Sequence, residues 1–297
     1  MLSQKNSTIG FIGTGVMGKS MAKNLLNSGY AVIVYNRTKQ KADELLAIGA
    51  EWANTPKEVA QKANIIITIV GYPKDVEEVY LGENGIIANA KEHSYTIDMT
   101  TSTPSLAKKI YEEGKKQQIH VLDAPVSGGD IGAKEAKLSI MVGGEKQAFT
   151  DLQPIFEILG TNIVYQGVAG AGQHTKMCNQ IAIASNMIGV CEAVVYAEKA
   201  GLNPDVVLQS ISSGAAGSFS LSNLAPRMIK GDFAPGFYIK HFIKDMRIAL
   251  EEAKAMEMDV PGLQLAESLY SRLSALGEDE SGTQALYKYY QQYSNKL

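Results

Sequence analysis

The fold is decided by residues 8–18, whose sequence is Thr-Ile-Gly-Phe-Ile-Gly-Thr-Gly-Val-Met-Gly. The first five residues are mostly apolar or β-branched, which predicts a buried strand. Gly13, Gly15 and Gly18 then have the spacing Gly-x-Gly-x-x-Gly, and a segment with helical periodicity follows. A second apolar run begins at Ala31. A strand, a glycine-rich turn, a helix and another strand in this order predict a parallel βαβ unit.

The same alternation continues toward the middle of the chain and predicts an α/β fold, a doubly wound and mostly parallel Rossmann sheet covered by helices on both faces. Further strands are predicted at 64–70, 95–99, 120–124, 138–142 and 158–165. Because ligands of such sheets bind at the carboxyl ends of the strands, the loops there are expected to converge on one cleft. These loops are 13–18, 36–38, 71–73 and 100–103.

A glycine-rich linker at 167–172 ends this part, so we expect a nucleotide-binding domain over 1–165 and a helical domain over 166–297. The linker leads into one long helix, predicted from about 173 to 200, which has no charged residue between Met177 and Cys191. Its amide and hydroxyl side chains argue against a membrane span and favour a buried helix that joins the two domains. Lys176 stands at its beginning, where a lone buried ammonium group is costly.

Composition restricts the class of protein. The chain has 297 residues, 45% of them hydrophobic and 20% charged, as in ordinary soluble proteins. A net charge of −3 gives no electrostatic reason to expect nucleic acid as a partner. Cys178 and Cys191 are too far apart on one helix to form a disulfide, and reduced thiols suit a cytoplasmic protein. No metal-binding motif and no signal-peptide pattern are present in the sequence.

The glycine turn predicts a dinucleotide site, with the pyrophosphate at the helix N-terminus; the alternative is a tight turn without a ligand. An NAD site usually carries Asp or Glu after the second strand, whereas this chain has Asn36-Arg37-Thr38. An arginine fork and a hydroxyl group, with no carboxylate to repel a phosphate, favour NADP over NAD. A solvated arginine with NAD as cofactor is the alternative. The cofactor-binding residues predicted in this domain are Gly13, Thr14, Gly15, Val16, Met17, Gly18, Asn36, Arg37, Thr38, Val70 and Thr101.

A second glycine-rich turn follows the strand predicted at 120–124. Ser127 offers a hydroxyl group, and Gly128 and Gly129 can present consecutive backbone N–H groups with no side chain in the way. Such a nest suits a carboxylate. Taken alone, the motif is more typical of a turn that binds nothing.

Four motifs in order resemble those of the β-hydroxyacid dehydrogenase family, which includes 3-hydroxyisobutyrate dehydrogenase, tartronate semialdehyde reductase and glyoxylate/succinic semialdehyde reductases. The motifs are the glycine turn 13–18 with Met21-Ala22, the segment 123–129, the run Gly170-x-Gly-x-x-x-Lys-x-x-Asn, and Lys244-Asp245. The resemblance covers nearly the whole chain. It implies a Rossmann domain followed by a helical domain that usually dimerises, so a homodimer or homotetramer is expected.

The resemblance also implies roles for individual residues. Lys176 would be the acid/base, Ser127-Gly128-Gly129 would bind the substrate carboxylate, and Lys244 would lie near the nicotinamide. An asparagine after the lysine orients the substrate in the family, but Gln180 stands where many relatives have Asn. Whether Asn179 or Gln180 contacts the substrate is therefore left open by the sequence.

The predicted function is the NADP(H)-dependent interconversion of a small β-hydroxy acid, of the 3-hydroxyisobutyrate or 2-hydroxy-3-oxopropionate type, and its semialdehyde. Lys176 would donate the proton, and we expect burial and Lys244 to lower the lysine pKa from about 10.4 toward the working pH. A glyoxylate/succinic semialdehyde reductase is the alternative substrate assignment. A non-catalytic dinucleotide sensor is the alternative of another class, and the retention of Lys176 and Ser127 argues against it.

Overall fold

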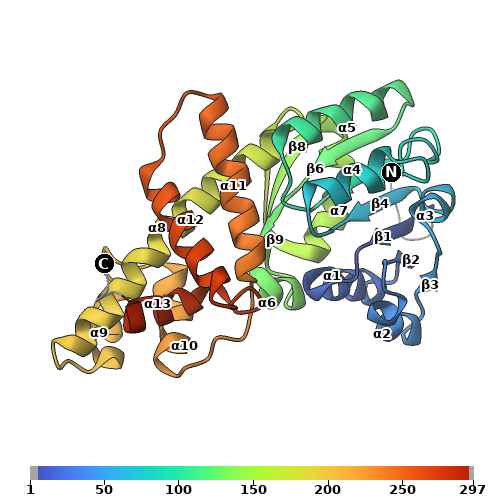
Figure 1. The fold of residues 1–297 in the computed structure, drawn as a ribbon. Helices are drawn as coiled ribbons and strands as arrows, with labels where there is room; N and C mark the ends of the chain where they lie inside the picture. The colour runs from blue at the N-terminus through green and yellow to red at the C-terminus, as the bar shows by residue number, and fades with distance from the viewer. Residues whose placement is uncertain (1–5, 294–297) are drawn as a thin grey trace. The chain divides into compact units, whose positions relative to one another are not determined.

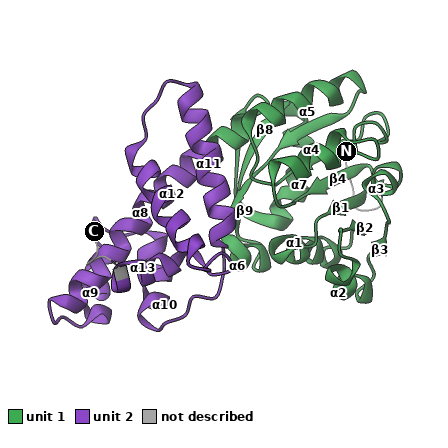
Figure 2. Cartoon of the chain, in the orientation of Figure 1, with its two compact units in different colours: residues 1–176 green, residues 177–297 purple. Residues whose placement is uncertain are grey.

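The computed structural model describes residues 6–293 of the chain. The chain forms two compact units, residues 1–176 and 177–297, called unit 1 and unit 2 (Figure 2). The division falls inside the long helix α8, Ala171–Lys199, whereas the sequence placed the change of architecture at 165/166.

Unit 1 is built on a nine-stranded sheet with helices on both sides (Figure 1). Its strands lie in the order β3-β2-β1-β4-β5-β6-β8-β7, and β9 pairs with β8. The strands are β1 Thr8–Ile12, β2 Ala31–Tyr35, β3 Glu51–Trp52, β4 Ile65–Thr68, β5 Tyr95–Asp98, β6 His120–Asp123, β7 Val126–Ser127, β8 Leu138–Gly144 and β9 Gly160–Gly167.

The first six strands are parallel, as the alternating pattern predicts, and β8 runs antiparallel to β6 and β7. Successive residues of β1 enter different cores, because side chains alternate across a strand. Ile9 and Phe11 belong to one apolar cluster, and Ile12 belongs to another that also contains Ile66 and Val121. The sheet is therefore buried on both faces, which confirms the doubly wound α/β prediction.

The helices of unit 1 connect these strands. They are α1 Val16–Asn27, α2 Asp43–Ala47, α3 Pro56–Lys62, α4 Pro73–Leu81, α5 Pro104–Lys116, α6 Gly129–Lys134 and α7 Lys146–Leu159, with a 3-10 turn at Lys39–Ala42. Three of them begin with proline directly after the N-cap position, where the missing N–H costs nothing. The last strand begins at Gly160 and not at 158, because α7 continues through Leu159. The short elements β3, β7 and α6 lie in stretches for which the sequence predicted no separate element.

The beginning of α8 is tied to the sheet by backbone contacts. Gly170 has φ +89°, and a Cβ atom on Gly172 would lie 2.4 Å from the Met141 carbonyl oxygen. Only glycine allows this approach, since real Cβ atoms do not come within 3.0 Å of another atom. The glycines of the linker therefore allow the first turn of α8 to pack against the strand ends.

Unit 2 is helical, as the sequence predicts. Its remaining elements are α9 Pro204–Ile211, a π-helical turn at Ser220–Leu224, α10 Ala225–Ile229, α11 Ile239–Ala255, α12 Pro261–Ala275, a 3-10 turn at Thr283–Ala285 and α13 Leu286–Tyr293. The π-helical turn leads directly into α10. Asn203 caps α9 with its side chain. On α11 one face is apolar: Ile243, Met246 and Ala253 are buried and Leu250 packs against the same core.

Helix α8 has the length and apolar composition of a helix that could cross a membrane. In the structure 39% of its most apolar window is buried, and Met187, Cys191 and Val194 belong to the core of unit 2. Both cysteines are free thiols, Cys178 exposed and Cys191 buried. Burial raises the pKa of the Cys191 thiol well above its usual value, so it stays protonated.

Candidate functional site

The three glycines after β1 have three different surroundings. Gly13 has φ +100°, and a Cβ atom there would lie 2.1 Å from the Ile69 carbonyl oxygen. A Cβ atom on Gly18 would lie 2.0 Å from the Gly13 carbonyl oxygen, so this glycine allows α1 to pack against the turn. A Cβ atom on Gly15 would meet no atom within 4 Å. The fold therefore requires glycine at 13 and 18, whereas the open space at 15 suits a ligand that approaches the backbone.

The N-terminus of α1 fits the phosphates of a dinucleotide. Gly15 is the N-cap residue and supplies no side-chain cap, and the first turn of the helix carries no acidic residue. The turn is held to the end of β2, because the Thr14 N–H donates to the Asn36 Oδ1 at 3.1 Å. Backbone N–H groups of this turn, together with the helix dipole, can bind an anion. Val16 and Met17 stand in this first turn, as predicted.

The surroundings of Arg37 correct one step of the sequence argument. The sequence suggested that no carboxylate lies near this side chain, but Asp75 of α4 pairs with it, with the Arg37 Nη1 at 3.1 Å from the Asp75 Oδ1. Asp75 is far along the chain, and the strand order β2-β1-β4 brings the beginning of α4 near the end of β2. The guanidinium is still 76% exposed, so other donors of its fork face solvent. Thr38, which follows, lies in extended backbone before the 3-10 turn.

Val70 and Thr101 follow the ends of β4 and β5. The Val70 N–H donates to the Thr100 hydroxyl at 3.0 Å, and the Thr100 N–H donates to the Asp98 carboxylate at 3.1 Å. Since β1, β2, β4 and β5 are parallel neighbours, the loops that follow them lie along one edge of the sheet. The structure thus places every predicted cofactor-binding residue of unit 1 at the same edge.

Lys176 lies in unit 1 beside the predicted carboxylate nest. Its Nζ donates to the Val126 carbonyl oxygen at 2.8 Å, and the side chain is only 6% exposed. Ser127 follows directly as the last residue of β7, and Gly128 and Gly129 have φ +134° and +64°. Positive φ at both glycines is a conformation that L side chains rarely adopt. A buried cation, a hydroxyl group and two glycine N–H groups are therefore brought together at this turn.

Two buried side chains fix the helix that carries Lys176. The Asp123 carboxylate accepts from the Gly170 N–H at 2.8 Å and from the Gln173 N–H at 2.9 Å. The Gln173 amide accepts from the Ser102 N–H and donates to the Thr100 carbonyl oxygen. Burial raises the pKa of Asp123 to about 6, although both backbone hydrogen bonds lower it. Through these bonds Asp123 fixes the beginning of α8.

In unit 2, Asn179 and Gln180 belong to a chain of hydrogen bonds that ends at Asp245. The Asn179 Nδ2 donates to the Gln180 Oε1 at 2.6 Å, and the Gln180 Nε2 donates to the Asp245 Oδ2 at 2.6 Å. Lys244 is mostly buried, with its Nζ 2.9 Å from the Asp245 Oδ1. Burial and the Lys244 charge lower the pKa of His241, one turn earlier on α11. Neither Gln173 nor Asp245 was predicted as part of a site; buried amide and carboxylate side chains in apolar helices are the signal for both.

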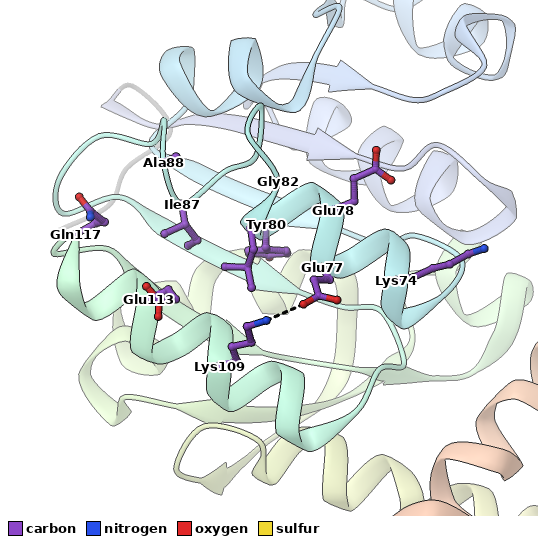
Figure 3. Close-up of a pocket in the computed structure, with 11 residues that line it drawn as sticks. Lys74, Glu77, Glu78, Tyr80, Gly82, Ile87, Ala88, Lys109, Glu113 and Gln117 are labelled. Atoms are coloured by element: carbon purple, nitrogen blue, oxygen red, sulfur yellow. Dashed lines mark hydrogen bonds and ion pairs between the residues drawn. The ribbon is translucent and has the colours of Figure 1, made fainter.

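A separate hollow of about 690 Å³ lies on the surface of unit 1 between α4 and α5 (Figure 3). Lys109 and Glu77 form an ion pair across it, and Tyr80 and Ile87 contribute apolar atoms. None of the predicted site residues lines it. Among the described residues no group of three or more His, Cys, Asp or Glu side chains could hold a metal ion.

Comparisons with known proteins agree with this arrangement. A family model described as the NAD binding domain of 6-phosphogluconate dehydrogenase matches residues 8–167. A second, described as the NAD-binding region of NADP-dependent 3-hydroxyisobutyrate dehydrogenase, matches residues 170–290. The 2-hydroxy-3-oxopropionate reductase of Escherichia coli is 40% identical over 94% of this chain and 95% of its own length. The chain belongs to the β-hydroxyacid dehydrogenase family.

Further relatives support this membership. An uncharacterized oxidoreductase of Bacillus subtilis is 66% identical over 95% of this chain and 98% of its own length. The solved structure of Mycobacterium tuberculosis 3-hydroxyisobutyrate dehydrogenase with L-serine has a TM-score of 0.86 and 28% identity, and the match covers 95% of this chain and 98% of that one. The protein is therefore an NAD(P)-dependent hydroxyacid dehydrogenase that acts on CH–OH groups.

Proposed function

We propose that the enzyme uses NADP(H) to interconvert a small β-hydroxy acid, of the 3-hydroxyisobutyrate or 2-hydroxy-3-oxopropionate type, and its semialdehyde. The observation that carries the proposal is the position of Lys176. Its buried ammonium group donates to the Val126 carbonyl oxygen, one residue before the nest of Ser127, Gly128 and Gly129. A carboxylate held by the nest would lie near a proton donor.

The nest and the lysine have different roles in this mechanism. The Ser127 hydroxyl and the N–H groups of Gly128 and Gly129 bind the carboxylate of the substrate and so fix its orientation. The Lys176 ammonium donates a proton to the carbonyl oxygen as negative charge develops there, and takes it back when the alcohol is oxidised. The Val126 carbonyl oxygen, which can only accept, orients the ammonium group before reaction.

The dinucleotide would lie along the edge of unit 1 that carries the glycine turn. Gly15 gives the close backbone approach that a pyrophosphate needs, Gly13 and Gly18 shape the turn, and Val70 and Thr101 would line the same edge. When bound, the reduced cofactor supplies the hydride to the carbonyl carbon. Lys244 is proposed to lie near the nicotinamide, as the family resemblance implies.

NADP is proposed over NAD because of Asn36, Arg37 and Thr38. Arg37 remains largely exposed and can offer its fork to a 2′-phosphate, and Thr38 adds a hydroxyl group. Among the hydrogen bonds of the described residues, Asp75 engages only one nitrogen atom of the guanidinium, Nη1. The ion pair orients the guanidinium fork, but it also places a negative charge near the proposed phosphate site.

A homodimer or homotetramer is part of the same proposal. Support comes from α8, which is strongly apolar although only 39% of its most apolar window is buried within the chain. Tyr196, near its end, is 74% exposed. Such a surface is suited to a second copy of this chain.

The test is the oxidation of NADPH by the purified enzyme with four aldehydes, followed at 340 nm and repeated with NADH. The aldehydes are 2-hydroxy-3-oxopropionate, methylmalonate semialdehyde, succinic semialdehyde and glyoxylate. We expect turnover of one of the first two, with kcat/KM higher for NADPH than for NADH. Equal use of the two cofactors would contradict the role of Arg37. Preference for either of the last two would assign the enzyme to the glyoxylate/succinic semialdehyde reductases, and no turnover with all four would refute the proposed substrate class.

A further inference from the structure

The backbone at the beginning of α4 holds the Asp75 carboxylate in place. Asp75 is the third residue of this helix, and its Oδ2 accepts a hydrogen bond from the Tyr72 N–H at 3.0 Å. The side chain is only 8% exposed. A negative charge suits the N-terminus of a helix, but the oxygen of an uncharged asparagine could accept the same bond. Capping therefore explains where the side chain lies and does not require its charge.

The second oxygen of this carboxylate faces Arg37. The Asp75 Oδ1 lies 3.1 Å from the Arg37 Nη1, and the arginine side chain is 76% exposed. Asp75 is thus the fixed partner of the ion pair, and the long exposed arginine is the one that can move. An ion pair with one member so exposed contributes little to stability. The negative charge stays at this point of the sheet edge whichever way the guanidinium turns.

A 2′-phosphate bound by the remaining donors of Arg37 would share one guanidinium with Asp75. Only that group would separate the two anions, so they would lie closer than the Debye length, which is about 10 Å at 0.1 M salt. Like charges at such a distance repel each other. NAD carries an uncharged hydroxyl group at the same position of its ribose. The repulsion therefore acts on NADP and not on NAD.

We propose that Asp75 is a specificity-determining residue that lowers the preference of the enzyme for NADP over NAD. Arg37 attracts the 2′-phosphate, and the fixed carboxylate beside it cancels part of that attraction. Asp75 also occupies one of the donor nitrogens that the phosphate could use. The inference rests on the proposed function, because it takes Arg37 as the residue that binds the 2′-phosphate.

Two variants separate the charge of Asp75 from its capping role. In Asp75→Asn the side-chain oxygen can still accept from the Tyr72 N–H, whereas the NH₂ group cannot accept from Arg37. Asp75→Ala removes the cap as well, so its melting temperature should be lower. Both variants remove the charge, and both should change the cofactor preference to a similar extent. Glu77→Gln is the matched control, because Glu77 lies on the same helix and pairs with Lys109 across the hollow toward α5 (Figure 3).

The measurement is the calorimetric affinity for adenosine 2′,5′-bisphosphate and for AMP, which carry the adenosine ends of NADP and NAD and undergo no turnover. We expect Asp75→Asn to raise the preference for the bisphosphate about fivefold, or about 1 kcal/mol, and to change the affinity for AMP less than about twofold. The gain should shrink between about 0.1 M and 1 M salt, because the Debye length falls from about 10 Å to 3 Å. Glu77→Gln should change the preference less than about twofold.

A preference that stays the same or falls in both Asp75 variants would overturn the proposal, and a fall would mean that the ion pair serves to orient the guanidinium fork. An equal gain in Glu77→Gln would also overturn it, since the effect would then belong to the net charge of the protein. Equal affinities of the wild type for both nucleotides, unchanged in Arg37→Ala, would refute the proposed use of NADP. A gain in Asp75→Asn in that case would still support the effect of the Asp75 charge.

Discussion

The replacement Asp123→Asn gives a prediction whose size can be worked out from the structure. Asp123 is 4% exposed and binds the N–H groups of Gly170 and Gln173 at the beginning of α8. Burial raises its pKa from 3.8 to about 6. Asparagine has nearly the same shape as the protonated acid, but it does not titrate. Comparing the two proteins as a function of pH therefore isolates the ionisation of this one carboxyl group.

The sign follows from proton linkage. A carboxyl group whose pKa is raised by folding binds its proton more tightly in the native state, so it contributes stability at low pH that is lost as the pH rises through about 6. Between about pH 4.5 and pH 7.5 this contribution falls by about 2 kcal/mol, because each pKa unit corresponds to about 1.4 kcal/mol. Other titrating groups are common to both proteins and cancel in the difference.

The assay is urea unfolding followed by the fluorescence of Trp52, the single tryptophan of the chain, which lies in β3 of unit 1. The unfolding free energy of the wild type minus that of Asp123→Asn should be about 2 kcal/mol larger at about pH 4.5 than at about pH 7.5. A difference that does not change with pH would refute the assignment of the raised pKa to Asp123. A difference in unfolding free energy that is larger at high pH than at low pH would mean that folding lowers the pKa of Asp123 and does not raise it.

Two further predictions concern the cofactor. Gly15→Ala should leave the stability of unit 1 within about 0.5 kcal/mol of the wild type and raise the KM for the dinucleotide at least about tenfold, because its methyl group would occupy the open space beside the turn. Gly18→Ala is the matched comparison: its methyl group would meet the Gly13 carbonyl oxygen at 2.0 Å, so urea unfolding should show a loss of stability. The same stability for both variants would contradict the separate roles of the glycines. Arg37→Ala should lower kcat/KM for NADPH by about ten- to a hundredfold and change that for NADH little, since charge-assisted hydrogen bonds to the 2′-phosphate would be lost; equal losses with both cofactors would argue against this role.

Most of the fold of unit 1 was predictable, because its information is local. The β-branched runs of β1, β2 and β4, with Gly13 after β1 and Gly71 and Pro73 after β4, predict strand, turn and helix without knowledge of distant residues. The antiparallel pairing of β8 was not predicted, since apolar runs carry no information about strand direction. The last strand was placed two residues early because Ile158 and Leu159, although apolar and typical of a strand, end α7.

The candidate site also has parts that the local sequence predicts and parts that depend on distant residues. The glycine turn and the nest could be predicted, since their chemistry lies in consecutive residues. The Arg37–Asp75 ion pair joins residues that are 38 positions apart, and the Gln180–Asp245 bond joins residues 65 positions apart. Neither pairing follows from a motif, because such contacts depend on the order of strands and on how helices pack.

The role of Lys176 as proton donor is tested most directly by Lys176→Ala, measured as the single-turnover oxidation of NADPH with the aldehyde that the wild type reduces best. The rate constant should fall at least about a hundredfold, the usual contribution of a general acid, while the dissociation constant for NADPH stays within about twofold of the wild type. Retention of most of the wild-type rate would contradict the proposed mechanism.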